Sequence, residues 1–179
     1  MRLEETPEIS FLYGLTYEGR RENLDIMRDL LTYLNNPHLS GVKYVHVTGT
    51  NGKGSVCSAV YSVLKRKYRA GLYVSPHVYR FNERITVNDK QIEDDYIINF
   101  IRGFMPIIEK LKKESKRPSF FEVVTSLAFE YFTRSGCEIA VIEVGLGGRL
   151  DPTNVINPLV SAITSIDLEH TQILGNTIE

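Results

Sequence analysis

The chain has 179 residues, of which 42% are hydrophobic and 24% are charged, and these values exclude a disordered tail, a collagen-like fibre and a disulfide-framed miniprotein. Lys and Arg number 21 and Asp and Glu 22, so the net charge of -1 gives no broad electrostatic reason to bind nucleic acid or an anionic membrane. Two distant cysteines, Cys57 and Cys137, without a signal-peptide pattern or a membrane-length apolar run, indicate reduced thiols and a cytoplasmic protein.

The apolar spacing predicts strands that alternate with helices, which is typical of an α/β fold with a mainly parallel sheet. In chain order we expect a helix over 23–34, a strand over 42–47, a glycine-rich turn at 49–54, a helix over 55–67, a strand over 70–74, a hairpin of 84–87 and 90–92, helices over 94–114 and 119–133, and strands over 139–144 and 159–166.

Three details of these elements are also predicted. Pro106 should kink or divide the helix over 94–114, and residues 110–117 should form an exposed basic loop. The last two strands are continuous apolar runs, which is typical of strands covered on both faces. Residues 176–179 resemble the first turn of a helix, so we expect this chain to be part of a longer protein.

The strongest local signal is the segment Thr48-Gly-Thr-Asn-Gly-Lys-Gly-Ser55, which joins a predicted strand to a predicted helix. Amide groups of such a turn and of the helix N-terminus bind phosphate, Lys53 adds a positive charge, and Ser55 offers a hydroxyl to phosphate or Mg²⁺. Val47 replaces the first glycine of the usual P-loop pattern, so the loop is a shorter variant. The alternative is a plain strand–turn–helix junction with Lys53 in solvent. The candidate nucleotide-binding residues are Gly49, Thr50, Asn51, Gly52, Lys53, Gly54 and Ser55.

Three further features follow predicted strands: Ser75-Pro-His77, Glu143 with its glycine-rich continuation, and Asp167-Leu-Glu-His170. Each is ambiguous alone, because Ser-Pro commonly starts turns, Glu143 could be an exposed strand tip, and a single histidine is more often a surface or core residue. The carboxyl ends of parallel strands, however, meet at the ligand-binding edge of an open α/β sheet. A phosphate loop, an acid, a hydroxyl and an imidazole at one edge indicate ATP with Mg²⁺. By chemistry alone His170 would contact phosphate, because Mg²⁺ prefers oxygen ligands.

Five motifs occur in a fixed order, and together they resemble one family. They are Thr48 to Ser55, Ser75-Pro-His77 with Arg80-Phe-Asn-Glu-Arg84, Ser119-Phe-Phe-Glu122, Glu143-Val-Gly-Leu-Gly-Gly-Arg-Leu-Asp151 with Thr153-Asn154, and Glu169-His170 with Leu174-Gly175. The set resembles the folylpolyglutamate synthase and dihydrofolate synthase family of the Mur ligase superfamily over residues 36–179.

The resemblance implies a three-layer Mur ligase central domain, incomplete at its C-terminus, with residues 1–179 as the N-terminal part of the ATP-binding domain and the glutamate-binding C-terminal domain outside the chain. It implies a monomer that uses ATP and Mg²⁺ to phosphorylate a folate or dihydropteroate carboxylate, which the amine of L-glutamate then attacks. It assigns catalysis to Lys53, Glu143 and His170, and metal binding to Ser75, Glu143 and His170. The implied pterin contacts are Phe120, Phe121, Glu122, Leu150, Asp151 and Pro152, although Phe120 and Phe121 could equally be core residues at a helix start.

Three other functions remain open from the sequence. A Mur-type ligase could use another acceptor, a P-loop kinase or NTPase could turn over ATP without making an amide, and a non-catalytic module could bind nucleotide alone.

Overall fold

The computed structural model describes residues 3–16 and 22–178. Its elements are η1 (Leu3–Glu5), α1 (Pro7–Tyr13), α2 (Asp25–Tyr33), η2 (Pro37–Leu39), β1 (Lys43–Thr48), α3 (Lys53–Leu64), β2 (Ala70–Tyr73), η3 (Phe81–Arg84), β3 (Ile85–Val87), β4 (Lys90–Gln91), α4 (Asp94–Lys113), α5 (Phe120–Arg134), β5 (Ile139–Glu143), η4 (Pro152–Val155), β6 (Val160–Ile163) and α6 (Thr171–Leu174).

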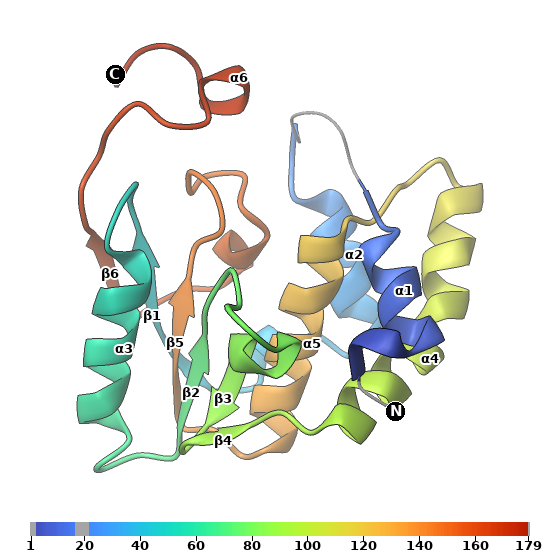
Figure 1. Cartoon of the computed structure of the whole chain (residues 1–179), viewed down its shortest axis with the longest axis horizontal. Coiled ribbons are helices and arrows are strands. Elements are labelled where there is room, and N and C mark those ends of the chain that lie inside the picture. Colours follow the sequence, from blue (N-terminus) through green and yellow to red (C-terminus); the bar gives the residue numbers. More distant parts are fainter. Residues whose placement is uncertain (1–2, 17–21, 179) are drawn as a thin grey trace.

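The strands form one mostly parallel sheet in the order β4-β3-β2-β5-β1-β6. Strands β2, β5, β1 and β6 are parallel, and the β3–β4 hairpin adds two antiparallel strands at one edge. The predicted α/β class is therefore confirmed. The pairing of Val47 with Glu143 brings the ends of β1 and β5 level, so the following loops gather at one edge of the sheet together with α6 (Figure 1).

Helices cover the sheet on both faces, which gives three layers (Figure 1). Helix α3 lies on one face, and α5 lies on the other with α2, α1 and α4 beyond it. Strand β5 shows how the sequence builds two cores, because Ile139 and Val141 pack in the cluster on the α3 side whereas Ala140 and Ile142 pack in the larger cluster on the α5 side. A continuous apolar strand is thus explained by burial on both faces.

Two helices show how local chemistry sets their limits. Helix α5 begins after a capping box, in which the Ser119 hydroxyl accepts from the Glu122 amide and the Glu122 carboxylate accepts from the Ser119 amide. Helix α4 is not divided at Pro106, and it includes the first four residues of the predicted 110–117 loop. Pro106 lies on the exposed side of α4, where water can bond the Arg102 carbonyl that has lost its N–H partner.

The prediction that strand 159–166 is covered on both faces was wrong. Strand β6 is shorter, it pairs with β1 on one side, and Val160 and Ile163 are 57% and 64% exposed. A continuous apolar run shows that a strand is apolar on both faces, but it does not show what covers those faces.

The ends of the described chain also differ from the prediction. Helix α1 was not predicted, and the last helix is α6 rather than a turn over 176–179, of which residues 176–178 are not helical and Glu179 lies outside the described residues. No helix in the described part of the chain is long and apolar enough to cross a membrane.

Candidate active site

The phosphate-type loop joins β1 to α3 at the carboxyl edge of the sheet, as the sequence predicts. Helix α3 begins at Lys53, and its N-cap residue Gly52 has φ of +84° and provides no side-chain cap. The first amides of this 12-residue helix therefore face the loop without a capping side chain, which suits an anion. The Lys53 ammonium donates hydrogen bonds to the Gly49 carbonyl at 2.8 Å and to the Thr50 carbonyl at 3.1 Å. These bonds connect the start of α3 to the beginning of the loop.

The segment that follows β6 fixes the other side of this loop. The Thr50 amide donates to the Ser165 carbonyl at 2.6 Å, and the Asp167 amide donates to the Thr50 hydroxyl at 3.0 Å. Gly49 has φ of +134°, and a Cβ there would lie 2.0 Å from the Thr164 hydroxyl oxygen. Only glycine permits this close contact between the two loops.

Glu143 ends β5 with a buried carboxylate rather than an exposed one. Glu143 is 5% exposed, and the Ser75 amide donates a hydrogen bond to its Oε2 at 2.8 Å. Burial raises the pKa of Glu143, while the Ser75 hydrogen bond and the positive charges of Lys53 and Arg84 lower it. A partly desolvated carboxylate beside a hydroxyl residue is thereby held at the sheet edge.

A cleft of about 490 Å³ brings most of the predicted polar residues together. It is lined by Lys53, Ser75, Glu143 and His170, with Thr48, Gly49 and Thr50 of the loop, whereas Asn51, Gly52, Gly54 and Ser55 lie outside its lining. His170 caps α6 with φ of +50°, and its side chain is 53% exposed. Its Nε2 lies 3.7 Å from Oε1 of Glu169.

The donor set of this cleft fits Mg²⁺ but not a closed protein cage. Among residues 3–16 and 22–178, no three His, Cys, Asp or Glu side chains cluster to hold a metal ion. Mg²⁺ is commonly bound through one or two carboxylates, with water and phosphate oxygens completing the shell. Glu143 forms no ion pair within the described residues, because Lys53 bonds the loop carbonyls instead, so a cation beside Glu143 would balance its charge.

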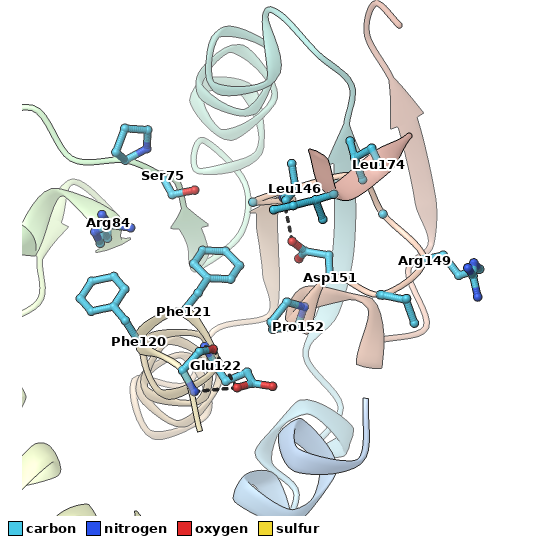
Figure 2. Close-up of a pocket in the computed structure, with 16 residues that line it drawn as sticks. Ser75, Arg84, Phe120, Phe121, Glu122, Leu146, Arg149, Asp151, Pro152 and Leu174 are labelled. Atoms are coloured by element: carbon cyan, nitrogen blue, oxygen red, sulfur yellow. Dashed lines mark hydrogen bonds between the residues drawn. The ribbon is translucent and has the colours of Figure 1, made fainter. Parts of the chain in front are cut away.

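A second cavity of about 660 Å³ lies next to the first. All six predicted pterin contacts line it, namely Phe120, Phe121, Glu122, Leu150, Asp151 and Pro152 (Figure 2). Its wall is mainly apolar, with a few charged groups, as in pockets that hold flat organic ligands. Ser75, Pro76, Gly145, Leu146 and Leu174 line both cavities, so the two share one boundary.

Phe120 and Phe121 both line this pocket and pack against the hydrophobic core. Phe120 and Phe121 are half-buried and pack against the core cluster on the α5 side. A Cβ on Gly145 would lie 2.6 Å from the Phe121 ring, so the glycine lets the ring approach the backbone. The Glu122 carboxylate is engaged at the start of α5, where it accepts from Ser119.

Asp151 is held by hydrogen bonds inside the pocket wall. It is 3% exposed, its Oδ2 accepts from the Leu146 amide at 2.8 Å, and its Oδ1 accepts from the Thr153 amide at 2.9 Å. Burial raises the pKa of Asp151, while bonds from the Thr153 hydroxyl and from the amides of Leu146, Thr153 and Gly145 lower it. These bonds fix the glycine-rich turn that separates the two cavities.

The sequence analysis assigned no role to Arg84, which lines the second cavity, or to Tyr13, which contacts Phe120 from outside that lining. Arg84 lines the second cavity with a buried guanidinium 5.2 Å from the Phe120 ring centre, and Tyr13 of α1 stacks on Phe120 at 5.3 Å. Arg84 ends the Arg80–Arg84 motif and directly precedes an apolar strand. A charged residue in that position could have been predicted as a candidate site residue. Tyr13 carried no signal, since α1 itself was not predicted.

Comparison with known proteins identifies the family. The model of the Mur ligase middle domain matches residues 47–179. The chain belongs to this family. Relatives of this chain include a dihydrofolate synthase/folylpolyglutamate synthase of Bacillus subtilis, 39% identical over 95% of this chain and 40% of the relative. A folylpolyglutamate synthase of Lacticaseibacillus casei is 43% identical over 83% of this chain and 35% of the relative.

Solved structures agree with these relatives. A structure described as an FPGS-AMPPCP-folate complex superposes with a TM-score of 0.89 at 36% identity, and covers 99% of this chain and 43% of that chain. The apo form of L. casei FPGS gives a TM-score of 0.88 at 36% identity. The chain thus spans less than half the length of these relatives and structures.

Proposed function

We propose that this chain is the N-terminal part of the ATP-binding domain of a longer ligase, which adds L-glutamate to a folate or dihydropteroate acceptor through an acyl phosphate. The glutamate-binding domain lies outside the chain in this proposal. The observation that carries it is the shared boundary of two unlike cavities, one with a phosphate-type loop and Glu143, the other with Phe120, Phe121 and Asp151. The similarity to proteins named dihydrofolate synthase or folylpolyglutamate synthase supports the same reaction.

The first step would be phosphoryl transfer in the polar cleft. An acceptor carboxylate oxygen attacks the γ-phosphorus of ATP, the bond to the β,γ-bridging oxygen breaks, and ADP leaves. The Gly49–Ser55 loop would bind the triphosphate, and Lys53 and the α3 amides would stabilise its negative charge. Ser75, Glu143 and His170 would hold Mg²⁺, which would supply positive charge to the phosphates when bound.

The second step would form the amide. The amine of L-glutamate attacks the acyl carbon, inorganic phosphate leaves, and the amine loses a proton. The acceptor must place its carboxylate at the boundary between the cavities while its ring system lies between Phe120, Phe121 and Asp151. Orientation supplies much of the rate, since both steps need reacting atoms in line.

The test is ADP release by the full-length protein with ATP and Mg²⁺, with L-glutamate and dihydropteroate or tetrahydrofolate added singly and together. We expect release that requires glutamate and one pterin. Release indifferent to both would replace the proposal by a P-loop NTPase, and release with glutamate and a non-pterin acceptor would replace it by another Mur-type ligase. The Glu143→Gln variant should lose release in every reaction.

A further inference from the structure

Arg84 is a buried cation on the wall of the second cavity. The residue is 7% exposed, and it forms no ion pair with any residue that the structure describes. A guanidinium withdrawn from water without an anionic partner is costly in free energy, because its lost hydration is not replaced. Such a group indicates that an anion completes the site when ligand binds.

The surroundings of Arg84 orient the guanidinium but leave part of it unused. Its Nε donates to Nδ1 of His77 at 2.8 Å. The guanidinium carbon, Cζ, lies 5.2 Å from the ring centre of Phe120 and 6.0 Å from that of Phe81. Because an arginine N–H can only donate, Nδ1 of His77 is the acceptor in this contact. The hydrogen bond to Nε leaves the two terminal amino groups to donate to a ligand.

Arg84 lines the second cavity only, but its backbone lies beside the residue that precedes Ser75. Its carbonyl accepts from the Val74 amide at 3.0 Å, which holds it beside the end of β2 and next to Ser75, a residue of both cavities. Figure 2 shows Arg84 on the same side of the pocket as Ser75 and Phe120, with Asp151 and Pro152 across from them. Its charge also reaches Glu143 in the polar cleft.

We infer that Arg84 binds the acceptor carboxylate that receives the phosphoryl group. The inference rests on the proposed function and deepens it, because it names the group that places the reacting carboxylate. Two parallel N–H donors match the two oxygens of a carboxylate, and the Nε hydrogen bond to His77 and the cation–π contact with Phe120 restrict where the guanidinium lies. An acceptor whose ring lies in the apolar pocket would then present its carboxylate beside Ser75, toward the phosphate-type loop.

The test measures how well the full-length protein distinguishes a carboxylate from a carboxamide. Pteroate and its carboxamide are titrated by calorimetry into the unaltered protein and into Arg84→Gln, Arg84→Lys and Arg80→Gln variants. We expect the unaltered protein to bind pteroate at least about tenfold more tightly than the amide, a preference that charged hydrogen bonds can supply. The matched control is Arg80, which belongs to the same motif as Arg84 but is exposed and forms an ion pair with Asp94. The Arg80→Gln variant should keep the preference for the carboxylate.

In the Arg84→Gln variant the preference should fall to about one while the affinity for the amide stays the same, a pattern that general unfolding would not give. A preserved preference in Arg84→Gln would overturn the inference and leave the ligase proposal intact. Failure of the unaltered protein to bind pteroate, its carboxamide and tetrahydrofolate would overturn both. If Arg84→Gln does not fold, the Arg84→Lys variant decides: a reduced preference supports the bidentate contact, and an undiminished one contradicts it.

Discussion

The imidazole of His46 in β1 contacts the hydroxyl of Thr153 in η4, with 2.8 Å between Nε2 and Oγ1. The Thr153 hydroxyl in turn donates to Asp151, whose carboxylate accepts from the Leu146 amide. Because the Thr153 proton goes to Asp151, its oxygen accepts from His46, and the chain of donors runs in one direction. Strand β1, which lies between β5 and β6, is thereby connected to the turn between the two cavities.

Replacing Thr153 by Val should break this connection at its centre. The buried N–H of His46 and one oxygen of Asp151 would each lose a partner, so we expect the free energy of unfolding to fall by about 1–3 kcal/mol. We also expect the KM for the pterin acceptor to rise several-fold with little change in the KM for ATP. Urea unfolding and steady-state kinetics of the full-length protein measure the two effects. Thr153→Ser keeps the hydroxyl and should resemble the unaltered protein; equal losses in both variants would contradict the argument.

His46 should also make stability depend on pH. Burial lowers its pKa to about 4 from an ordinary 6.5, so between these values the unfolded chain binds a proton that the folded chain does not. Stability contributed by the neutral imidazole is therefore complete above pH 6.5 and is lost as the pH falls toward 4, by at most about 1.4 kcal/mol per pH unit.

The measurement is chemical unfolding from pH 7 to pH 4, compared between the unaltered protein and His46→Gln. Asp151 and Glu143 have raised pKa values and act in the opposite direction, so only the difference between the two proteins isolates His46. We expect that difference to change steadily across the window. A difference that is constant with pH would show that His46 does not stay neutral in the fold.

The sequence could predict the parts of the site that depend on neighbours in the chain. The phosphate-type loop follows from a strand, closely spaced glycines and a helix, and the burial of Glu143 follows from its place at the end of an apolar strand. The contact of His46 with Thr153 spans 107 positions, and the approach of Arg84 to Phe120 depends on how η3 packs against α5. Residue patterns specify strands and turns, but such pairings depend on the order of strands in the sheet.

The exposed faces of β6 illustrate the same limit from another side. Residues 159–166 have the composition of a central strand, yet β6 pairs only with β1 in the part of the chain that the structure describes. The preference of Val and Ile for a pleated, covered surface predicts the strand itself. Whether the faces of β6 are buried depends on which other segments pack against them, and the sequence of the strand does not specify those segments.

Glu143→Gln should raise stability while it abolishes activity. The carboxylate is buried without an ion pair among the described residues, and a neutral amide of similar shape can still accept from the Ser75 amide. In the absence of nucleotide and metal at pH 7, we expect an increase of roughly 1–2 kcal/mol in the free energy of unfolding. Because the pKa of Glu143 is raised, this gain should shrink as the pH falls and the carboxyl group becomes protonated.

The same variant tests the cation site without an activity assay. Millimolar Mg²⁺ with ATP should raise the melting temperature of the unaltered protein and should do so much less for Glu143→Gln. A Glu143→Asp variant keeps the charge and should retain part of the Mg²⁺ effect. Equal stabilisation of all three proteins would remove Glu143 from the cation site.

Gly49→Ala should damage the phosphate-type loop through its contact with the segment after β6. The new Cβ would lie 2.0 Å from the Thr164 hydroxyl and 2.9 Å from the Ser165 carbonyl, at a φ of +134° that side chains rarely adopt. The Thr164 side chain can rotate, but the Ser165 carbonyl belongs to the backbone, so the loops must separate. We expect a loss of about 1–3 kcal/mol in the free energy of unfolding and an increase of about tenfold or more in the KM for ATP.

Gly103→Ala is the matched control, because Gly103 lies on the exposed side of α4 with nothing within 4 Å of a new Cβ. That substitution should increase stability by up to about 1 kcal/mol and leave the KM for ATP unchanged. Gly49 lines the polar cleft but not the second cavity. We therefore expect Gly49→Ala to raise the KM for ATP more than the KM for the acceptor. An unchanged KM for ATP, or an equal increase in the KM values for ATP and the pterin, would contradict the assignment of the loop to the triphosphate.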